Sequence, residues 1–104
     1  MPKEVKIPFQ SEFKDRMLSG QKTYTTRTKR YGRPMDWFRA FGAFFTLIEV
    51  FEVHLNFVAD TCYMGEGFDS RQDFIACWNK LHPNVTFEEK RDRTVYLHRF
   101  IRSK

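Results

Sequence analysis

The sequence predicts an α+β domain in which a mixed, largely antiparallel β-barrel or curled sheet carries two or three peripheral helices. Several segments alternate apolar and polar residues as strands do, and others have helical spacing. Few of the expected strands are joined by the long helical crossovers that parallel sheets require. The 104 residues are near the usual size of one domain and contain no repeat or linker, so we expect a single domain over residues 1–104.

The first quarter of the chain predicts a strand, a helix and a second strand. Residues 5–9 have the composition of a short strand, and residues 11–19 repeat apolar side chains every four positions, as a helix does. Gly20 supplies the left-handed position that ends a helix without steric cost, so the chain can reverse into a strand that starts near Lys22.

The middle of the chain predicts two more strands after a loop. Residues 28–35 contain a glycine, a proline and three basic residues, which is typical of a loop. Residues 36–41 and 43–55 are rich in β-formers, and Gly42 is expected at a tight turn or bulge between them. Alternation in the longer segment is imperfect, as in a sheet that is partly covered on both sides.

The last third predicts a helix and a closing strand. The helix begins at Ser70, presents Phe74 and Trp78 on one side, and ends at His82-Pro83. Residues 93–101 alternate again and form the closing strand. With a short helical turn near residues 57–60, the predicted order is β-α-β-β-β-α-β.

Composition excludes several classes of protein and site. No apolar run approaches the ~20 residues of a membrane-spanning helix, and the N-terminus has no secretory signal, which predicts a cytoplasmic protein without membrane association. Cys62 and Cys77 form no CxxC pair and are expected as free core thiols. Since His54, His82 and His98 have no metal-ligand spacing with each other or with the cysteines, we expect no metal and no other cofactor.

Positive charge is unevenly distributed. The net charge is +5, yet the basic residues concentrate in residues 27–39 and 90–104, while residues 40–89 are net acidic. Two such segments side by side would form a face that attracts nucleic-acid phosphates, and solvated surface charge is the alternative. The residues expected to contact nucleic acid are Lys29, Arg30, Tyr31, Arg33, Arg99 and Arg102.

The stretch GQKTYTTR, residues 20–27, concentrates polar groups in a predicted strand. In an ideal strand Thr25 and Arg27 share one face and Lys22 lies on the other, but alternation often fails at the entry to a strand, so all three could converge. A threonine hydroxyl needs a neighbouring base to act as a nucleophile, and a lysine serves only if its pKa is lowered. The alternative is an exposed threonine-rich strand with solvated charges.

Two motifs resemble those of a known family. Gly20-x-Lys22-x-x-Thr25-x-Arg27 resembles the G-x-K-x-x-T-x-R signature of the ASCH domain, a small relative of the PUA domain first noticed in RNA-linked proteins. Downstream, Glu66-Gly67-Phe68 is similar to the family's E-G-F segment. The resemblance implies a PUA-like β-barrel with a cleft between these two segments, in which Glu66 faces Lys22.

The resemblance also implies functions for this cleft. The first is binding of RNA or of a modified nucleoside by Lys22, Thr25, Arg27 and Glu66. The alternative is amidohydrolase activity on N4-acetylcytidine, as in some small ASCH proteins, with Thr25 attacking the acetyl group, Lys22 transferring the proton and Glu66 assisting the leaving amine. In either case Arg27 would hold the strand or contact the nucleoside. Ribonuclease activity in the same cleft is a third possibility.

Overall fold

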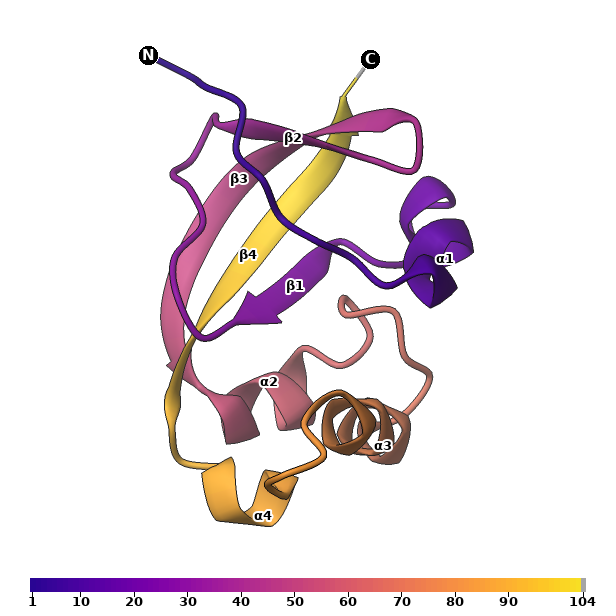
Figure 1. Cartoon of the computed structure of the whole chain (residues 1–104), viewed down its shortest axis with the longest axis vertical. Coiled ribbons are helices and arrows are strands. Elements are labelled where there is room, and N and C mark those ends of the chain that lie inside the picture. The colour runs from indigo at the N-terminus through magenta and orange to yellow at the C-terminus, as the bar shows by residue number, and fades with distance from the viewer. Residues whose placement is uncertain (104) are drawn as a thin grey trace.

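The computed structural model describes residues 1–103 and contains one curled antiparallel sheet with its helices grouped at one end and one side (Figure 1). The strand order is β1-β4-β3-β2. The strands are β1 (Tyr24–Arg27), β2 (Trp37–Ala40), β3 (Ala43–His54) and β4 (Thr94–Ser103). The predicted α+β architecture, a largely antiparallel curled sheet with peripheral helices, is therefore confirmed.

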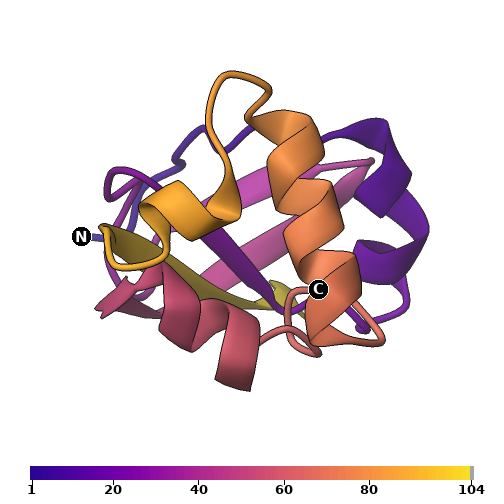
Figure 2. The ribbon, with the colours of Figure 1, turned by 90° about the horizontal axis from the view of Figure 1, so that it is seen from below.

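The helices are short. They are a 3-10 turn at Ser11–Phe13, α1 (Lys14–Leu18), α2 (Leu55–Thr61), α3 (Arg71–Leu81) and α4 (Phe87–Lys90). Seen from below, α2, α3 and α4 lie across the end of the curled sheet, and α1 lies beside α3 (Figure 2). No helix among residues 1–103 is long and apolar enough to cross a membrane.

The strand expected at residues 5–9 is wrong. The N-terminal segment makes a single parallel bridge, between Glu4 and Trp37, in which the Val5 amide donates to the Trp37 carbonyl at 2.8 Å. Pro8 has no amide hydrogen and cannot continue a ladder. The segment is nevertheless fixed, because the side chains of Val5 and Ile7 are buried in the core.

The two predicted glycine turns are confirmed. Gly20 has φ +85° directly after the C-cap of α1, the left-handed position that side-chain-bearing residues avoid. At the β2–β3 hairpin, Phe41 and Gly42 both have positive φ, 54° and 78°, as the central residues of a type I′ turn do.

One helix was not predicted. Thr86 and Glu89 form a complete capping box at the start of α4, in which the Thr86 hydroxyl accepts from the Glu89 amide and the Glu89 carboxylate accepts from the Thr86 amide. The T-x-x-E spacing carried this signal, but α4 has only four residues and no apolar repeat to reveal it.

The central strand β4 is covered on both faces, whereas its neighbour β1 lies at an edge of the sheet. Inside the curl, Phe100 packs edge-on against Phe38 and Phe45, with ring centroids 5.3 and 5.5 Å apart. On the helical side Leu97 is buried, and its neighbour His98 is buried on the opposite face. Strand β1 pairs with β4 alone, so it forms one edge of the sheet.

Candidate functional site

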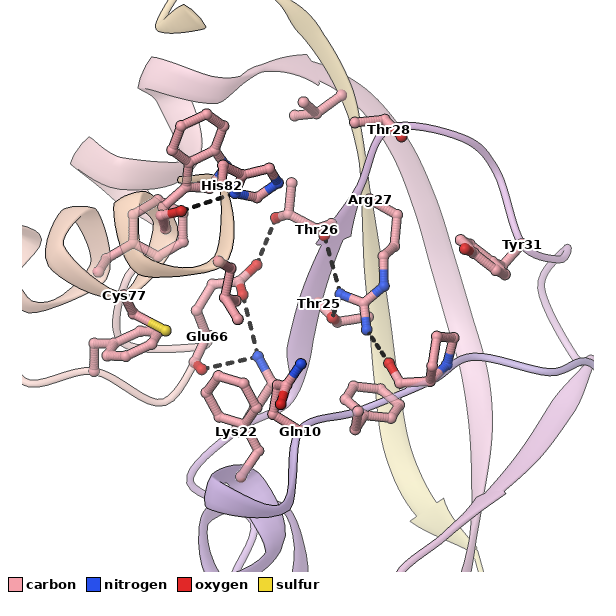
Figure 3. Close-up of a pocket in the computed structure, with 18 of the residues that line it drawn as sticks. Gln10, Lys22, Thr25, Thr26, Arg27, Thr28, Tyr31, Glu66, Cys77 and His82 are labelled. Carbon is pink, nitrogen blue, oxygen red and sulfur yellow. Dashed lines mark hydrogen bonds and ion pairs between the residues drawn. The ribbon is translucent and has the colours of Figure 1, made fainter. Parts of the chain in front are cut away.

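A cavity of about 480 Å³ lies along β1, between the N-terminal segment and α3. Its walls include Phe9 and Gln10 of the N-terminal segment, Tyr31 of the loop after β1, and Trp78 and His82 at the end of α3. Lys22, Thr25, Thr26, Arg27 and Glu66 also border this cavity. Figure 3 shows how these polar side chains approach one another from different segments. The structure therefore brings together the four residues that the sequence singled out as ligand-binding.

The polar residues reach the cavity from both faces of β1. Successive side chains of a strand point to opposite faces, so Lys22 and Thr26 share one face while Thr25 and Arg27 share the other. Both pairs line the cavity. Since β1 is an edge strand, the cavity extends around that edge and receives side chains from both faces.

Lys22 is buried and fully hydrogen-bonded, with only 3% of its side chain exposed. Its Nζ donates to the Tyr24 carbonyl at 2.8 Å, the Glu66 carbonyl at 3.0 Å and Glu66 Oε1 at 3.1 Å. The ring of Phe13 lies 4.7 Å from the same nitrogen. These three acceptors match the three protons of an ammonium group.

The protonation of Lys22 reflects two opposed effects. Burial lowers the pKa of Lys22, and the adjacent Glu66 carboxylate acts in the opposite direction. A neutral amine would direct a lone pair at one of its three acceptors, so the observed contacts favour the ammonium form. Lys22 is thus arranged as a hydrogen-bond donor and not as a free base.

Glu66 is positioned by two glycines and links Lys22 to Thr26. A side chain at Gly65 would meet the ring of Tyr24, because its Cβ would lie 2.0 Å from a ring carbon, and Gly67 has φ +99°. Between them, Glu66 Oε2 accepts from the Thr26 hydroxyl at 2.6 Å (Figure 3). The E-G-F segment therefore delivers one buried carboxylate to the cavity.

Arg27 joins the other face of β1 to the N-terminal segment. Its guanidinium donates to Thr25 Oγ1 at 2.6 Å, to the Thr26 carbonyl at 3.1 Å and to the Pro8 carbonyl, and it lies over the ring of Phe9. Within residues 1–103 no carboxylate lies within 4.0 Å of this guanidinium, so neutral oxygens alone hold it.

His98 supports the same face from β4. It pairs with Thr25 in register, and its Nε2 accepts from the Tyr31 amide at 3.0 Å. Because Nε2 accepts, Nδ1 carries the proton and donates to the Tyr96 carbonyl at 3.1 Å. Burial lowers the pKa of His98, which matches this neutral form. His98 therefore anchors the loop that places Tyr31 at the cavity.

The hydroxyl contacts differ from those that a Thr25–Lys22 nucleophile pair would make. Among the described residues, no hydrogen bond joins Thr25 to Lys22, whose protons are directed to Tyr24 and Glu66. It is Thr26 that contacts Glu66. Thr26 was missed by sequence reasoning, although it lies four residues after Lys22 and so shares its face in a strand.

Of the three basic residues after β1, Lys29 lies beside a ring of the cavity wall. Lys29 Nζ lies 5.0 Å from the ring centroid of Tyr31, which lines the cavity, and the Arg30 guanidinium lies 5.7 Å from that of Tyr96. Arg33 contributes its backbone amide, which donates to Asp36.

The two basic residues of β4 lie farther along the strand. Arg99 is ion-paired with Glu49 at 2.9 Å, and Arg102 donates to the Leu18 carbonyl at 3.3 Å. Counted from Tyr96, they are three and six residues along β4, which corresponds to roughly 10 and 20 Å. Arg99 lies opposite Tyr24 in the β1–β4 pairing, and neither Arg99 nor Arg102 lines the cavity.

Three cavity residues carried other interpretations in the sequence. Trp78 belongs to the apolar stripe of α3, His82 was expected at the end of that helix and without a metal, and Cys77 was expected as a core thiol. Cys62 is buried, while Cys77 is half-buried in the cavity wall, and both are free thiols. Within residues 1–103 no group of three His, Cys, Asp or Glu side chains could hold a metal ion.

Comparison with known proteins gives structural matches. No protein-family model and no curated protein matches the sequence. The ASCH domain from Lactobacillus crispatus JV V101 aligns with a TM-score of 0.68 at 14% identity, covering 97% of this chain and 79% of that one. The hypothetical protein PH0355 aligns with a TM-score of 0.69 at 12% identity, covering 99% and 100%.

A third solved structure agrees with these two. Protein EF3133 from Enterococcus faecalis V583, of the DUF984 family, aligns with a TM-score of 0.66 at 15% identity, covering 98% of this chain and 80% of that one. At such identities a structural likeness establishes the fold. The chain therefore has an ASCH-like α+β fold, as its two motifs predicted.

Proposed function

We propose that this protein binds a single nucleobase, as a nucleoside or within single-stranded RNA, in the cavity along β1. The observation that carries the proposal is the buried Lys22–Glu66–Thr26 cluster at the wall of a cavity that several aromatic rings also line. A nucleobase requires both kinds of surface, because its faces stack and its edges form hydrogen bonds.

The dimensions and walls of the cavity suit such a ligand. Its volume of about 480 Å³ lies within the range of small-molecule sites. Phe9 and Tyr31 offer rings on one side, and Trp78 and His82 offer rings on the side of α3. The ASCH-like fold adds support, since the family was first noticed in RNA-linked proteins.

Positive charge near the cavity suits a phosphate attached to the base. Arg27 is held by neutral oxygens, and Arg93 also lines the cavity. Lys29 and Arg30 belong to the loop that carries Tyr31. An RNA strand would therefore gain affinity over a nucleoside, and this gain would decrease with salt as counterion release requires.

Calorimetric titration with nucleosides and with short single-stranded RNAs, at two salt concentrations, tests the proposal. We expect saturable binding, with a salt dependence for RNA that nucleosides lack. Replacing Tyr31 by Leu removes a cavity ring and should weaken binding, whereas Tyr63→Leu, outside the cavity, serves as the matched control. Absence of binding by every nucleoside and RNA at both salt concentrations would contradict the proposal.

A second candidate function is hydrolysis of N4-acetylcytidine, since burial lowers the pKa of Lys22 in a cavity that Thr25 and Thr26 also line. For this function Lys22 would have to lose a proton and turn from its three acceptors toward Thr25. The Thr25 hydroxyl would then attack the acetyl carbonyl, pass its proton through Lys22 to the leaving amine and release cytidine. Water would hydrolyse the acetyl-threonine ester to acetate.

Chromatography of cytidine release from N4-acetylcytidine tests this second function. Turnover that is lost in Thr25→Val and retained in Thr61→Val, a threonine outside the cavity, would establish it. No release at high protein concentration, with nucleoside binding intact, would leave binding as the function.

A further inference from the structure

Trp78 and His82 form a wall of the cavity that is separate from the polar cluster on β1. Their rings stack with centroids 4.0 Å apart and an interplanar angle of 18°. His82 is the C-cap of α3, and its Nδ1 lies 2.8 Å from the Trp78 carbonyl. This bond satisfies one of the last carbonyls of the helix and fixes the ring in place.

The same bond determines what the other ring nitrogen can do. A carbonyl oxygen only accepts hydrogen bonds, so Nδ1 must carry the proton. In the neutral ring Nε2 is then an acceptor. Across the part of the chain that the structure describes, Nε2 has no hydrogen-bond partner, and the ring borders the cavity on the α3 side (Figure 3). Helix capping accounts for Nδ1 and leaves Nε2 available to a ligand.

We propose that His82 selects the ligand by accepting, at Nε2, a hydrogen bond from an exocyclic amino group of the base. This inference rests on the proposed function, whose cavity it shares. A base with an amino group, such as cytosine or adenine, would donate to Nε2. The corresponding keto base would place an oxygen lone pair against the nitrogen lone pair and leave both without a partner, which disfavours binding.

Two matched pairs of nucleosides test this selection: cytidine with uridine, and adenosine with inosine. For the pair that binds, we expect wild-type protein to favour the amino member by several-fold up to about tenfold, the range for one net hydrogen bond. His82→Phe keeps a ring beside Trp78 but removes Nε2, so the preference should fall to within about twofold. His54→Phe, an exposed histidine outside the cavity, should keep the wild-type preference.

The ratio of the two affinities within a pair separates recognition from stability. Loss of the hydrogen bond from Nδ1 would weaken the binding of both members of a pair by the same factor and leave this ratio unchanged. If His82→Phe does not fold, His82→Lys, whose ammonium can still donate to the Trp78 carbonyl but offers no acceptor, decides by the same ratio. A preference for the keto member, or an amino preference that survives both substitutions, would overturn this inference alone. No binding of any of the four nucleosides by wild-type protein would overturn the proposed function, and this inference with it.

Discussion

The two faces of β1 carry polar networks of different kinds. On one face Lys22 and Glu66 form a buried ion pair that also holds Thr26. On the other face Arg27 is held by Thr25 and by backbone carbonyls, with no carboxylate in contact among the described residues. The first network has a carboxylate in contact with its cation, and the second does not.

This difference indicates what each face contributes. The Lys22 ammonium and the Glu66 carboxylate are already paired with each other. They therefore form a fixed pattern of hydrogen-bond donors and acceptors, to which a ligand can bind without burying an additional charge. Arg27 instead joins β1 to Pro8 and stacks over Phe9, so it connects the edge strand to a segment that makes no ladder with it. The first face therefore holds a fixed polar cluster at the cavity wall, and the second face joins the edge strand to the N-terminal segment.

The largest expected effect comes from breaking the ion pair. Lys22→Met leaves the Glu66 carboxylate buried without its cation, and we expect the free energy of unfolding to fall by about 3 to 5 kcal/mol. Urea denaturation measures it. Adding Glu66→Gln to the same protein should restore most of the loss, because no unpaired charge then remains. A Lys22→Met protein as stable as wild type would show that the pair is solvated and would remove the distinction between the two faces.

A smaller effect is expected on the Arg27 face. Arg27→Met removes three hydrogen bonds to neutral oxygens but leaves no buried charge behind, so we expect a loss of about 1 to 3 kcal/mol. Arg99→Met is the matched control, since its exposed ion pair with Glu49 should contribute under about 1 kcal/mol. Equal effects of the two substitutions would mean that Arg27 does not hold the N-terminal segment to β1.

The smallest effect is a pH dependence that belongs to the Arg27 face. Burial lowers the pKa of His98 below 6.5, so at mildly acidic pH the unfolded chain binds more protons than the folded chain, and stability falls as the pH falls. Protonation would also break the bond from the Tyr31 amide to Nε2. Urea midpoints at pH 7.5 and 5.5 should differ more for wild type than for His98→Gln. If the two midpoints differ as much in His98→Gln as in wild type, a group other than His98 causes the pH dependence.

Much of the fold follows from local sequence. The helix α3, the long strand β3 and the turns at Gly20 and Gly42 were predicted because periodicity and backbone freedom determine them locally. The strand at residues 5–9 was wrong because its apolar side chains do pack in the core while its backbone forms only one bridge. Burial and hydrogen bonding usually coincide in strands, and sequence alone does not separate them.

The site was predictable where a motif marked it. Lys22 and Glu66 lie 44 residues apart, and the resemblance of two motifs predicted that they would meet. Thr26 could have been found from strand alternation once Lys22 and Glu66 were paired. Trp78 and His82 could not, because an aromatic stripe on a helix is the same whether it faces the core or a cavity, and the packing of α3 beside β1 decides between them.

The most direct test of the central claim uses the tryptophan in the cavity. The chain has two tryptophans, of which Trp78 lines the cavity and Trp37 does not, so Trp37→Phe leaves one reporter at the site. Titrating this variant with the nucleosides or short RNAs that bind should change the Trp78 fluorescence with the same dissociation constant that calorimetry gives. Binding seen by calorimetry with no change in Trp78 fluorescence would place the ligand elsewhere and contradict the account.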